Sequence, residues 1–97
     1  MHARVTSLSG SPAKVDAGIA DFREKVVPFT HEQGGKGGIL LVDRQTGKAI
    51  AITLWEDEQA LRASEERANA LRAAVAEEMH TTEQPTVDRY EVAVFET

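Results

Sequence analysis

The chain has 97 residues, a 41% apolar fraction and no cysteine, which suits one globular domain without disulfides or thiolate chemistry. Its 11 basic and 16 acidic residues give a net charge of −5, and the scattered basic residues argue against nucleic-acid binding. No apolar run approaches the roughly 20 residues of a membrane span, and no secretory segment follows the first residues. We therefore expect a single cytoplasmic domain over residues 1–97, without nucleic-acid or membrane partners.

The beginning of the chain predicts a strand followed by a helix. Residues 2–9 are rich in β-forming side chains and end at Gly10. Ser11 then suits a helix N-cap, and Pro12 suits the first helical position. One apolar stripe follows at helical spacing: Val15, Ile19, Phe22, Val26 and Phe29. Pro28 lies inside this stripe, so we expect a kink or a loosened last turn there.

The middle of the chain predicts a β-hairpin. Residues 39–43 and 48–56 read as strands, and the tight turn between them ends at Gly47, which suits positive φ. The glycine-rich segment 34–38 precedes this hairpin. Because a strand rather than a helix follows the glycines, the segment is better interpreted as a connecting loop than as a phosphate-binding loop.

The end of the chain predicts a second helix and a last strand. Asp57 can cap a helix that we expect to run to about Met79. The expected buried stripe of this helix is Leu61, Ala68, Leu71, Val75 and Met79. A loop over residues 81–85 then leads to a strand over residues 86–96. The order of elements predicts a ferredoxin-like βαββαβ fold of the α+β class, with a four-stranded antiparallel sheet and two helices on one face.

The predicted strands are apolar on both faces. In the third strand Ile50, Ile52 and Leu54 share one face, which we assign to the helices. The opposite face carries Ala49, Ala51, Thr53 and Trp55. Two helices cover only one face of a sheet, so the other face would expose a large apolar patch. The sequence therefore predicts a homodimer that forms through the open face of the sheet.

Several segments together resemble a known family. They are residues 22–28 in the kinked first helix, the glycine-rich entry to Ile39, and the hairpin over 39–56. Residues 54–61, Leu-Trp-Glu-Asp-Glu-Gln-Ala-Leu, place an aromatic residue and an acid at the strand end, just before the second helix. Residues 89–92 are similar to the family's final strand. On these segments the chain resembles the dimeric α+β barrel superfamily, and within it the antibiotic biosynthesis monooxygenase-like domains.

This resemblance implies a pocket between the sheet and the helices of each subunit. Some members of the family oxidise aromatic polyketides with molecular oxygen and without metal or flavin, and others degrade haem. The haem-degrading branch uses an asparagine on the first strand and a Trp and a His on the second helix. Residues 2–9 contain no asparagine, Trp55 precedes the helix, and His80 lies at or beyond its end. We therefore do not expect haem degradation.

Four residues are predicted to bind a ligand in this pocket. Phe22 and Leu71 lie on the two helical stripes, Ser64 interrupts the second stripe, and Trp55 is the single tryptophan. Trp55 could instead be a packing residue, and the Ser64 hydroxyl could instead bond back to the carbonyl of residue 60. Trp55 reaches the pocket only if the strand ends or twists at Leu54. Otherwise Trp55 belongs to the dimer interface.

The catalytic candidates are weak. They are His31 and His80, whose near-neutral pKa suits proton transfer, and Tyr90, whose hydroxyl could orient a ligand. Both histidines lie near helix ends, where contact with terminal carbonyls is the alternative. Arg72 is interpreted as a solvated or snorkelling side chain. No histidine has metal-binding spacing and no dinucleotide fingerprint occurs, so we predict no metal, haem or flavin cofactor.

Two functions remain open at this point. The first is a cofactor-independent monooxygenase that acts on a small aromatic or polyketide-like substrate, which the family resemblance favours. The second is a non-catalytic ligand-binding or interaction domain of the same fold, which the small number of inward polar residues favours. An enclosed cavity with a polar group facing it would support ligand chemistry, whereas a filled core would not.

Overall fold

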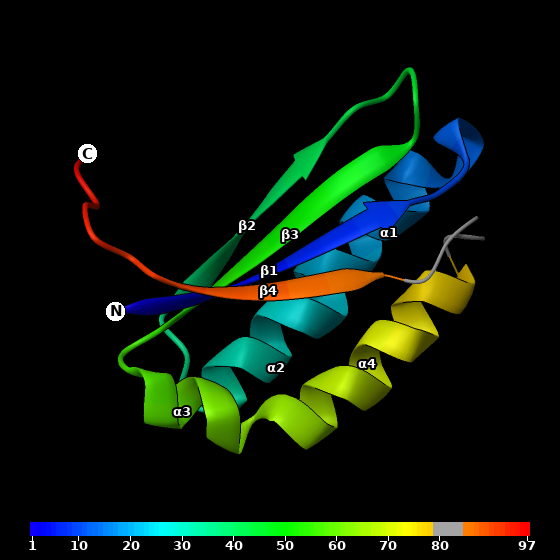
Figure 1. Ribbon diagram of the computed structural model, residues 1–97. Helices are drawn as coiled ribbons and strands as arrows, with labels where there is room; N and C mark the ends of the chain where they lie inside the picture. The colour runs from blue at the N-terminus through cyan, green and yellow to red at the C-terminus, as the bar shows by residue number, and fades with distance from the viewer. Residues whose placement is uncertain (79–84) are drawn as a thin grey trace.

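The computed structural model describes residues 1–78 and 85–97 of the chain. Its elements are β1 (His2–Ser9), a 3-10 turn (Pro12–Lys14), α1 (Val15–Asp21), a π-helical segment (Phe22–Val26), α2 (Val27–Glu32), β2 (Gly37–Val42), β3 (Lys48–Trp55), α3 (Glu58–Ala63), α4 (Glu65–Glu78) and β4 (Thr86–Glu91). The strands form one antiparallel sheet in the order β2-β3-β1-β4. The helices lie against one face of this sheet (Figure 1), which confirms the predicted ferredoxin-like fold.

The first helix begins where the sequence predicts, and its geometry changes just before Pro28 rather than at it. The Ser11 hydroxyl accepts a hydrogen bond from the Ala13 N–H at 3.3 Å, and Pro12 occupies the first helical position. Pro28 has no N–H to donate to the carbonyl four residues earlier, and a π-helical segment directly precedes α2. The helix is therefore loosened in the π-helical segment before Pro28 and not in its last turn, which continues as α-helix to Glu32.

The second helix is divided, which corrects the prediction of one helix to Met79. Asp57 caps α3 as expected, and its carboxylate accepts from the Ala60 N–H at 2.8 Å. The helix breaks at Ser64, whose hydroxyl donates to the Leu61 carbonyl at 2.8 Å rather than to the carbonyl of residue 60. Met79 and His80 lie outside the described residues. In the described part, no helix has the length and apolar character that a membrane crossing requires.

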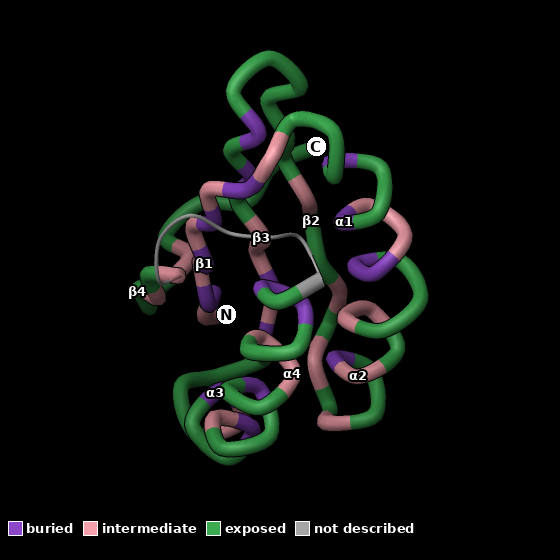
Figure 2. The backbone as a smooth tube through the Cα atoms, turned by 90° about the vertical axis from the view of Figure 1, so that its right-hand side faces the viewer, coloured by how far each residue is buried: buried purple, intermediate pink, exposed green. Residues whose placement is uncertain are grey.

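The two faces of the sheet are the reverse of the prediction for the third strand. Buried and more exposed positions alternate along β1 and β3 (Figure 2). On β3 the small residues Ala49 and Thr53 are buried against the helices, whereas Ile50 is 39% exposed on the open face. Large side chains supplied from the helices take the space on the inner face. Phe22, for example, packs so closely that a Cβ on Gly38 would lie 2.9 Å from its ring.

The last strand is shorter than predicted. It ends at Glu91, and not at residue 96, because its only described neighbour is β1, whose first residue His2 pairs with Glu91. One further hydrogen bond joins the Val92 N–H to the Met1 carbonyl at 2.8 Å. Beyond it the chain runs without a strand partner (Figure 1), and Phe95 is exposed.

The hairpin turn holds Gly47 at φ +81°, as the sequence predicts. We expect Gly47→Ala to lower the free energy of unfolding by about 2 kcal/mol, because a Cβ there overlaps the Gly10 carbonyl oxygen and lies 2.8 Å from the Pro12 nitrogen. Gly34→Ala is the control, since Gly34 also has positive φ but nothing within 4 Å of an added Cβ. Urea denaturation should show that Gly34→Ala lowers the free energy of unfolding by about 1 kcal/mol. Equal losses would contradict the steric argument.

Candidate functional site

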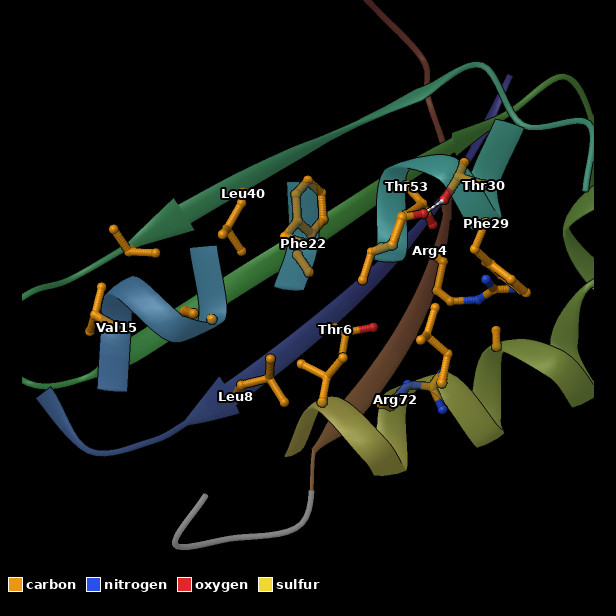
Figure 3. A pocket seen from close by; sticks show the side chains of 18 residues that line it. Arg4, Thr6, Leu8, Val15, Phe22, Phe29, Thr30, Leu40, Thr53 and Arg72 are labelled. Atoms are coloured by element: carbon orange, nitrogen blue, oxygen red, sulfur yellow. Dashed lines mark hydrogen bonds between the residues drawn. The ribbon is translucent and has the colours of Figure 1, made fainter. Parts of the chain in front are cut away.

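A cavity lies between the inner face of the sheet and the helices (Figure 3). The space open to the centre of a water-sized sphere is about 70 Å³, whereas about 10–15 Å³ on this measure holds one water. Its walls are mainly apolar and include Leu8, Val15, Phe22, Phe29, Leu40 and Leu71. The polar lining residues are Arg4, Thr6, Thr30, Thr53 and Arg72. The cavity therefore suits a small apolar ligand with a few fixed polar contacts.

Small residues leave the space that the cavity occupies. Ala49 and Ala51 of β3, Gly18 of α1 and Ala68 of α4 all line it. The strand period of two places Ala49, Ala51 and Thr53 on the same inner face, where they pair with Leu8, Thr6 and Arg4 of β1. From Ala49 to Thr53 the inner face of β3 thus carries only short side chains, and the large Trp55 follows at the end of the strand.

Arg4 connects the sheet to the helix break. The residue is only 4% exposed, and its Nη2 donates to the Leu61 carbonyl at 2.9 Å and to the Ser64 hydroxyl at 2.8 Å. Its guanidinium lies over the Trp55 ring, 5.3 Å from the centroid. The break between α3 and α4 therefore supplies acceptors for an arginine that the strand would otherwise bury without partners.

Among the described residues, Glu65 is the one carboxylate bonded to Arg4. Arg89 of β4 donates two hydrogen bonds to Glu65, from Nε to Oε1 at 2.6 Å and from Nη2 to Oε2 at 2.7 Å. Arg4 Nη2 lies 3.4 Å from the same Oε1. The Arg89 hydrogen bonds, together with the Arg4 charge, lower the pKa of Glu65 from 4.5 to about 2 against the opposing effect of burial.

The lowered pKa of Glu65 predicts acid sensitivity. Its stabilising contribution is complete above the ordinary pKa of 4.5 and is lost as pH falls towards 2. We expect Glu65→Gln to lower the free energy of unfolding at neutral pH by about 1–2 kcal/mol, discounted for the partly exposed Arg89. The difference from the unsubstituted protein should shrink across this acid range in urea titrations. The exposed neighbour variant Glu66→Gln should change little, and a difference that persists at the acid end would contradict the assignment.

The predicted ligand-binding residues occupy two different places. Phe22 and Leu71 line the cavity, whereas Trp55 and Ser64 do not. Trp55 is completely buried on the inner face of the sheet, and its Nε1 donates to the Thr53 hydroxyl at 3.0 Å. Ser64 is bonded to Arg4. Trp55 and Ser64 therefore contact the cavity only through Arg4 and Thr53, and the ligand roles of all four residues stay predictions.

The two catalytic candidates that the structure describes, His31 and Tyr90, lie away from the cavity. His31 is exposed on α2, and Tyr90 is 56% exposed on β4, where it shares the open face of the sheet with Leu54. His80 falls outside the described residues. Among the described residues, no His, Asp, Glu or Tyr lines the cavity, and no group of three or more His, Cys, Asp or Glu could hold a metal ion.

Arg4 is the lining residue that reasoning from the sequence misses, and for Arg72 that reasoning favours a solvated or snorkelling side chain over a cavity residue. Arg4, Thr6 and Leu8 occupy every second position of β1, so their side chains share one face of the strand. The shared face with the apolar Leu8 was the available signal that Arg4 points inward. Arg72 follows the inward Leu71 on α4 and is half-buried rather than fully solvated. Neither residue belongs to a motif, and only their common position at the cavity reveals them.

Comparison of sequences finds relatives of unknown activity. No protein-family profile matches this chain. The uncharacterized protein Rv2558 of Mycobacterium tuberculosis is 44% identical over 77 residues, which cover 78% of this chain and 33% of that protein. The chain spans at most about two-fifths of the length of the curated relatives it matches.

Comparison of structures identifies the fold. The monooxygenase ActVA-Orf6 of Streptomyces coelicolor, in complex with nanaomycin D, has a TM-score of 0.76 at 17% identity over 99% of this chain and 92% of that chain. SnoaB of Streptomyces nogalater, a cofactor-independent oxygenase studied as the mutant N63A, has a TM-score of 0.68 at 19% identity over 97% and 94%. The chain therefore has the fold of these oxygenases, which is the fold that the resemblance in the sequence implies.

Proposed function

We propose that this domain is a cofactor-independent monooxygenase for a small aromatic or polyketide-like substrate bound in the cavity. The observation that carries the proposal is an apolar cavity with a few polar groups, among them Arg4 and Arg72, set between sheet and helices. The same fold occurs in ActVA-Orf6, a monooxygenase with bound nanaomycin D, and in SnoaB, a cofactor-independent oxygenase. Fold alone does not transfer activity, so the proposal depends on the cavity.

The proposed chemistry needs little from the protein. A phenolic substrate with an acidic ring methylene loses a proton, and the resulting anion donates electrons to molecular oxygen. The methylene becomes a carbonyl, one oxygen atom stays in the product, and the other leaves as water. All four electrons come from the substrate, so no external reductant is consumed. The protein would bind the substrate, orient it and favour its ionised form.

One observation favours the second function, a non-catalytic ligand-binding domain. The described lining contains no imidazole or carboxylate that could accept the substrate proton. In the oxygenase, the proton would therefore pass to a water molecule in the cavity. The two functions share the binding step and differ only in whether bound substrate consumes oxygen.

Oxygen uptake separates these functions. The protein is incubated with hydroxylated tricyclic aromatics that carry a ring methylene, in ¹⁸O₂ and with a chelator present, after its absorbance spectrum has been recorded. We expect one ¹⁸O atom per product. Ala51→Leu, which fills the cavity, should abolish turnover, and Ala70→Leu on the exposed side of α4 should not. Tight binding of these compounds without oxygen uptake would establish the binding domain instead. A visible cofactor band would overturn cofactor independence.

We also propose that the domain forms a homodimer through the open face of the sheet. Exposed large apolar side chains support this, namely Ile39, Leu41, Ile50, Tyr90, Val94 and Phe95. The first four lie on β2, β3 and β4, and the last two lie in the C-terminal segment beyond β4. Paired open faces would remove these side chains from water.

A further inference from the structure

Positive charge gathers at one end of the cavity. Arg4 and Arg72 line that end, and Arg89 lies beside them through Glu65. Figure 3 places Arg4 and Arg72 towards one end and Leu8, Val15 and Leu40 towards the other. Arg4 and Arg89 thus contact Glu65, the Glu65 charge also acts on Arg72, and Asp88 is a second carboxylate that acts on Arg89. The net charge of the whole chain is −5. The local excess of positive charge is therefore opposite in sign to the whole chain.

Glu65 does not neutralise the two lining arginines. Arg89 binds both oxygens of Glu65, and Arg4 approaches only one of them, at 3.4 Å. Within the described part of the chain, Arg72 has no ion pair, and its Nη1 donates to the neutral Asn69 side chain at 2.6 Å. Among the described residues, Glu65 is the carboxylate whose charge acts on Arg4 and Arg72, so the cavity end keeps an excess of guanidinium charge.

Burial of this excess positive charge is unfavourable. Arg4 is almost completely buried, and its Nε has no hydrogen-bond acceptor among the described residues. Desolvation lowers the pKa of Arg4 and of Arg72, and for Arg72 the next contribution is repulsion by Arg4. A bound anion would offset both effects, because charge-assisted hydrogen bonds to guanidinium strengthen away from water.

We infer that the cavity selects an amphipathic organic anion, a carboxylate or a phenolate, whose charged oxygen faces Arg4 and Arg72 while its apolar body lies against Phe22 and Leu40. This inference rests on the proposed function and narrows its substrate class, since an uncharged aromatic of the same shape leaves the arginines unbalanced. Arg72 sets the preference for charge, because Arg4 is already committed to the helix break through Nη2.

The test compares small ring compounds of matched shape by isothermal titration calorimetry. The first pair is 4-methylbenzoate and the uncharged 4-methylbenzamide. The second pair is 4-nitrophenolate, at a pH where it is ionised, and uncharged 4-nitroanisole. We expect each anion to bind at least about tenfold tighter than its neutral partner. The pair with the larger ratio identifies whether the natural ligand carries a carboxylate or a phenolate.

Substitutions in α4 test whether Arg72 causes the preference for anions. Arg72→Gln keeps a long polar side chain and should reduce the anion preference to about twofold or less, whereas Arg72→Lys should retain most of it. Arg67→Gln removes an exposed arginine from the same helix and should leave the preference unchanged. The neutral compounds should bind all these variants alike, which separates loss of charge recognition from loss of folding.

Three results would count against the inference. Equal binding of anion and neutral partner would overturn anion selection while leaving the cavity as a ligand site and the proposed function intact. Retention of the preference in Arg72→Gln together with its loss in Arg67→Gln would place anion recognition outside the cavity. Failure of all four compounds to bind would overturn this inference and the proposed function together.

Discussion

Trp55→Ala is expected to lower the free energy of unfolding by about 3–5 kcal/mol, measured by urea denaturation. Trp55 is completely buried, its Nε1 donates to Thr53, and the Arg4 guanidinium lies over its ring. Removing the indole leaves a large void on the inner face and also exposes one face of a buried cation. The loss should therefore combine packing with electrostatics.

Trp55→Phe serves as the matched control. It keeps an aromatic face under Arg4 but removes the hydrogen bond to the Thr53 hydroxyl and part of the volume, so we expect a loss of about 1–2 kcal/mol. Because Trp55 faces the helices, neither substitution should change the dimer dissociation constant in conditions where the variant is folded. A loss below 1 kcal/mol for Trp55→Ala, or weaker dimerisation of the folded variant, would contradict this placement.

Ile50→Asp is expected to raise the dimer dissociation constant at least about 100-fold. Ile50 is partly exposed on the open face and pairs in register with the equally outward Leu41 of β2. In a two-fold dimer the substitution buries two unpaired carboxylates, one from each subunit. The same position is already near water in the single chain, so the fold of the monomer should survive.

Light scattering and sedimentation measure this effect. Phe95→Asp examines the exposed C-terminal segment in the same way and should also weaken the dimer, while Thr46→Asp at the exposed hairpin turn should not. A stable monomer of the unsubstituted protein at micromolar concentration would disprove the homodimer. Unchanged association of Ile50→Asp would show that the copies meet through another surface.

The sequence predicts the fold because its local signals agree with one another. Ser11 and Pro12 begin one helix, Asp57 caps another, and Gly47 closes the hairpin, each through a short-range effect that neighbouring residues specify. The two apolar faces of the strands likewise indicate an uncovered sheet surface. None of these signals depends on distant parts of the chain, which is why they can be interpreted without coordinates.

The orientation of β3 could not be derived in this way. Large Ile50 and Ile52 suggested the helix side, yet the helices pack over Ala49, Ala51 and Thr53. When both faces of a strand are apolar, periodicity gives the parity but not which face meets the helices. The sizes of the side chains that the helices contribute decide which face of β3 they cover.

The cavity was equally dependent on distant contacts. Phe22 and Leu71 were predicted as wall residues from their helical stripes, and both line the cavity. The only signal for Arg4 was its strand parity, because its partners Leu61, Ser64 and Glu65 are far away in the sequence. The helix break at Ser64 involves the same distant contacts with Arg4, so the sequence pattern did not predict it.

Mapping of ligand-induced shifts in backbone amide resonances tests the central claim most directly. The protein is titrated with 4-methylbenzoate while its ¹⁵N-resolved spectrum is recorded. We expect the largest shifts at residues that line the cavity, among them Phe22, Leu40 and Leu71, with a matching change at Trp55 Nε1 behind Arg4. Shifts confined to the open face, at Leu41, Ile50 and Tyr90, would contradict the assignment of the cavity as the ligand site.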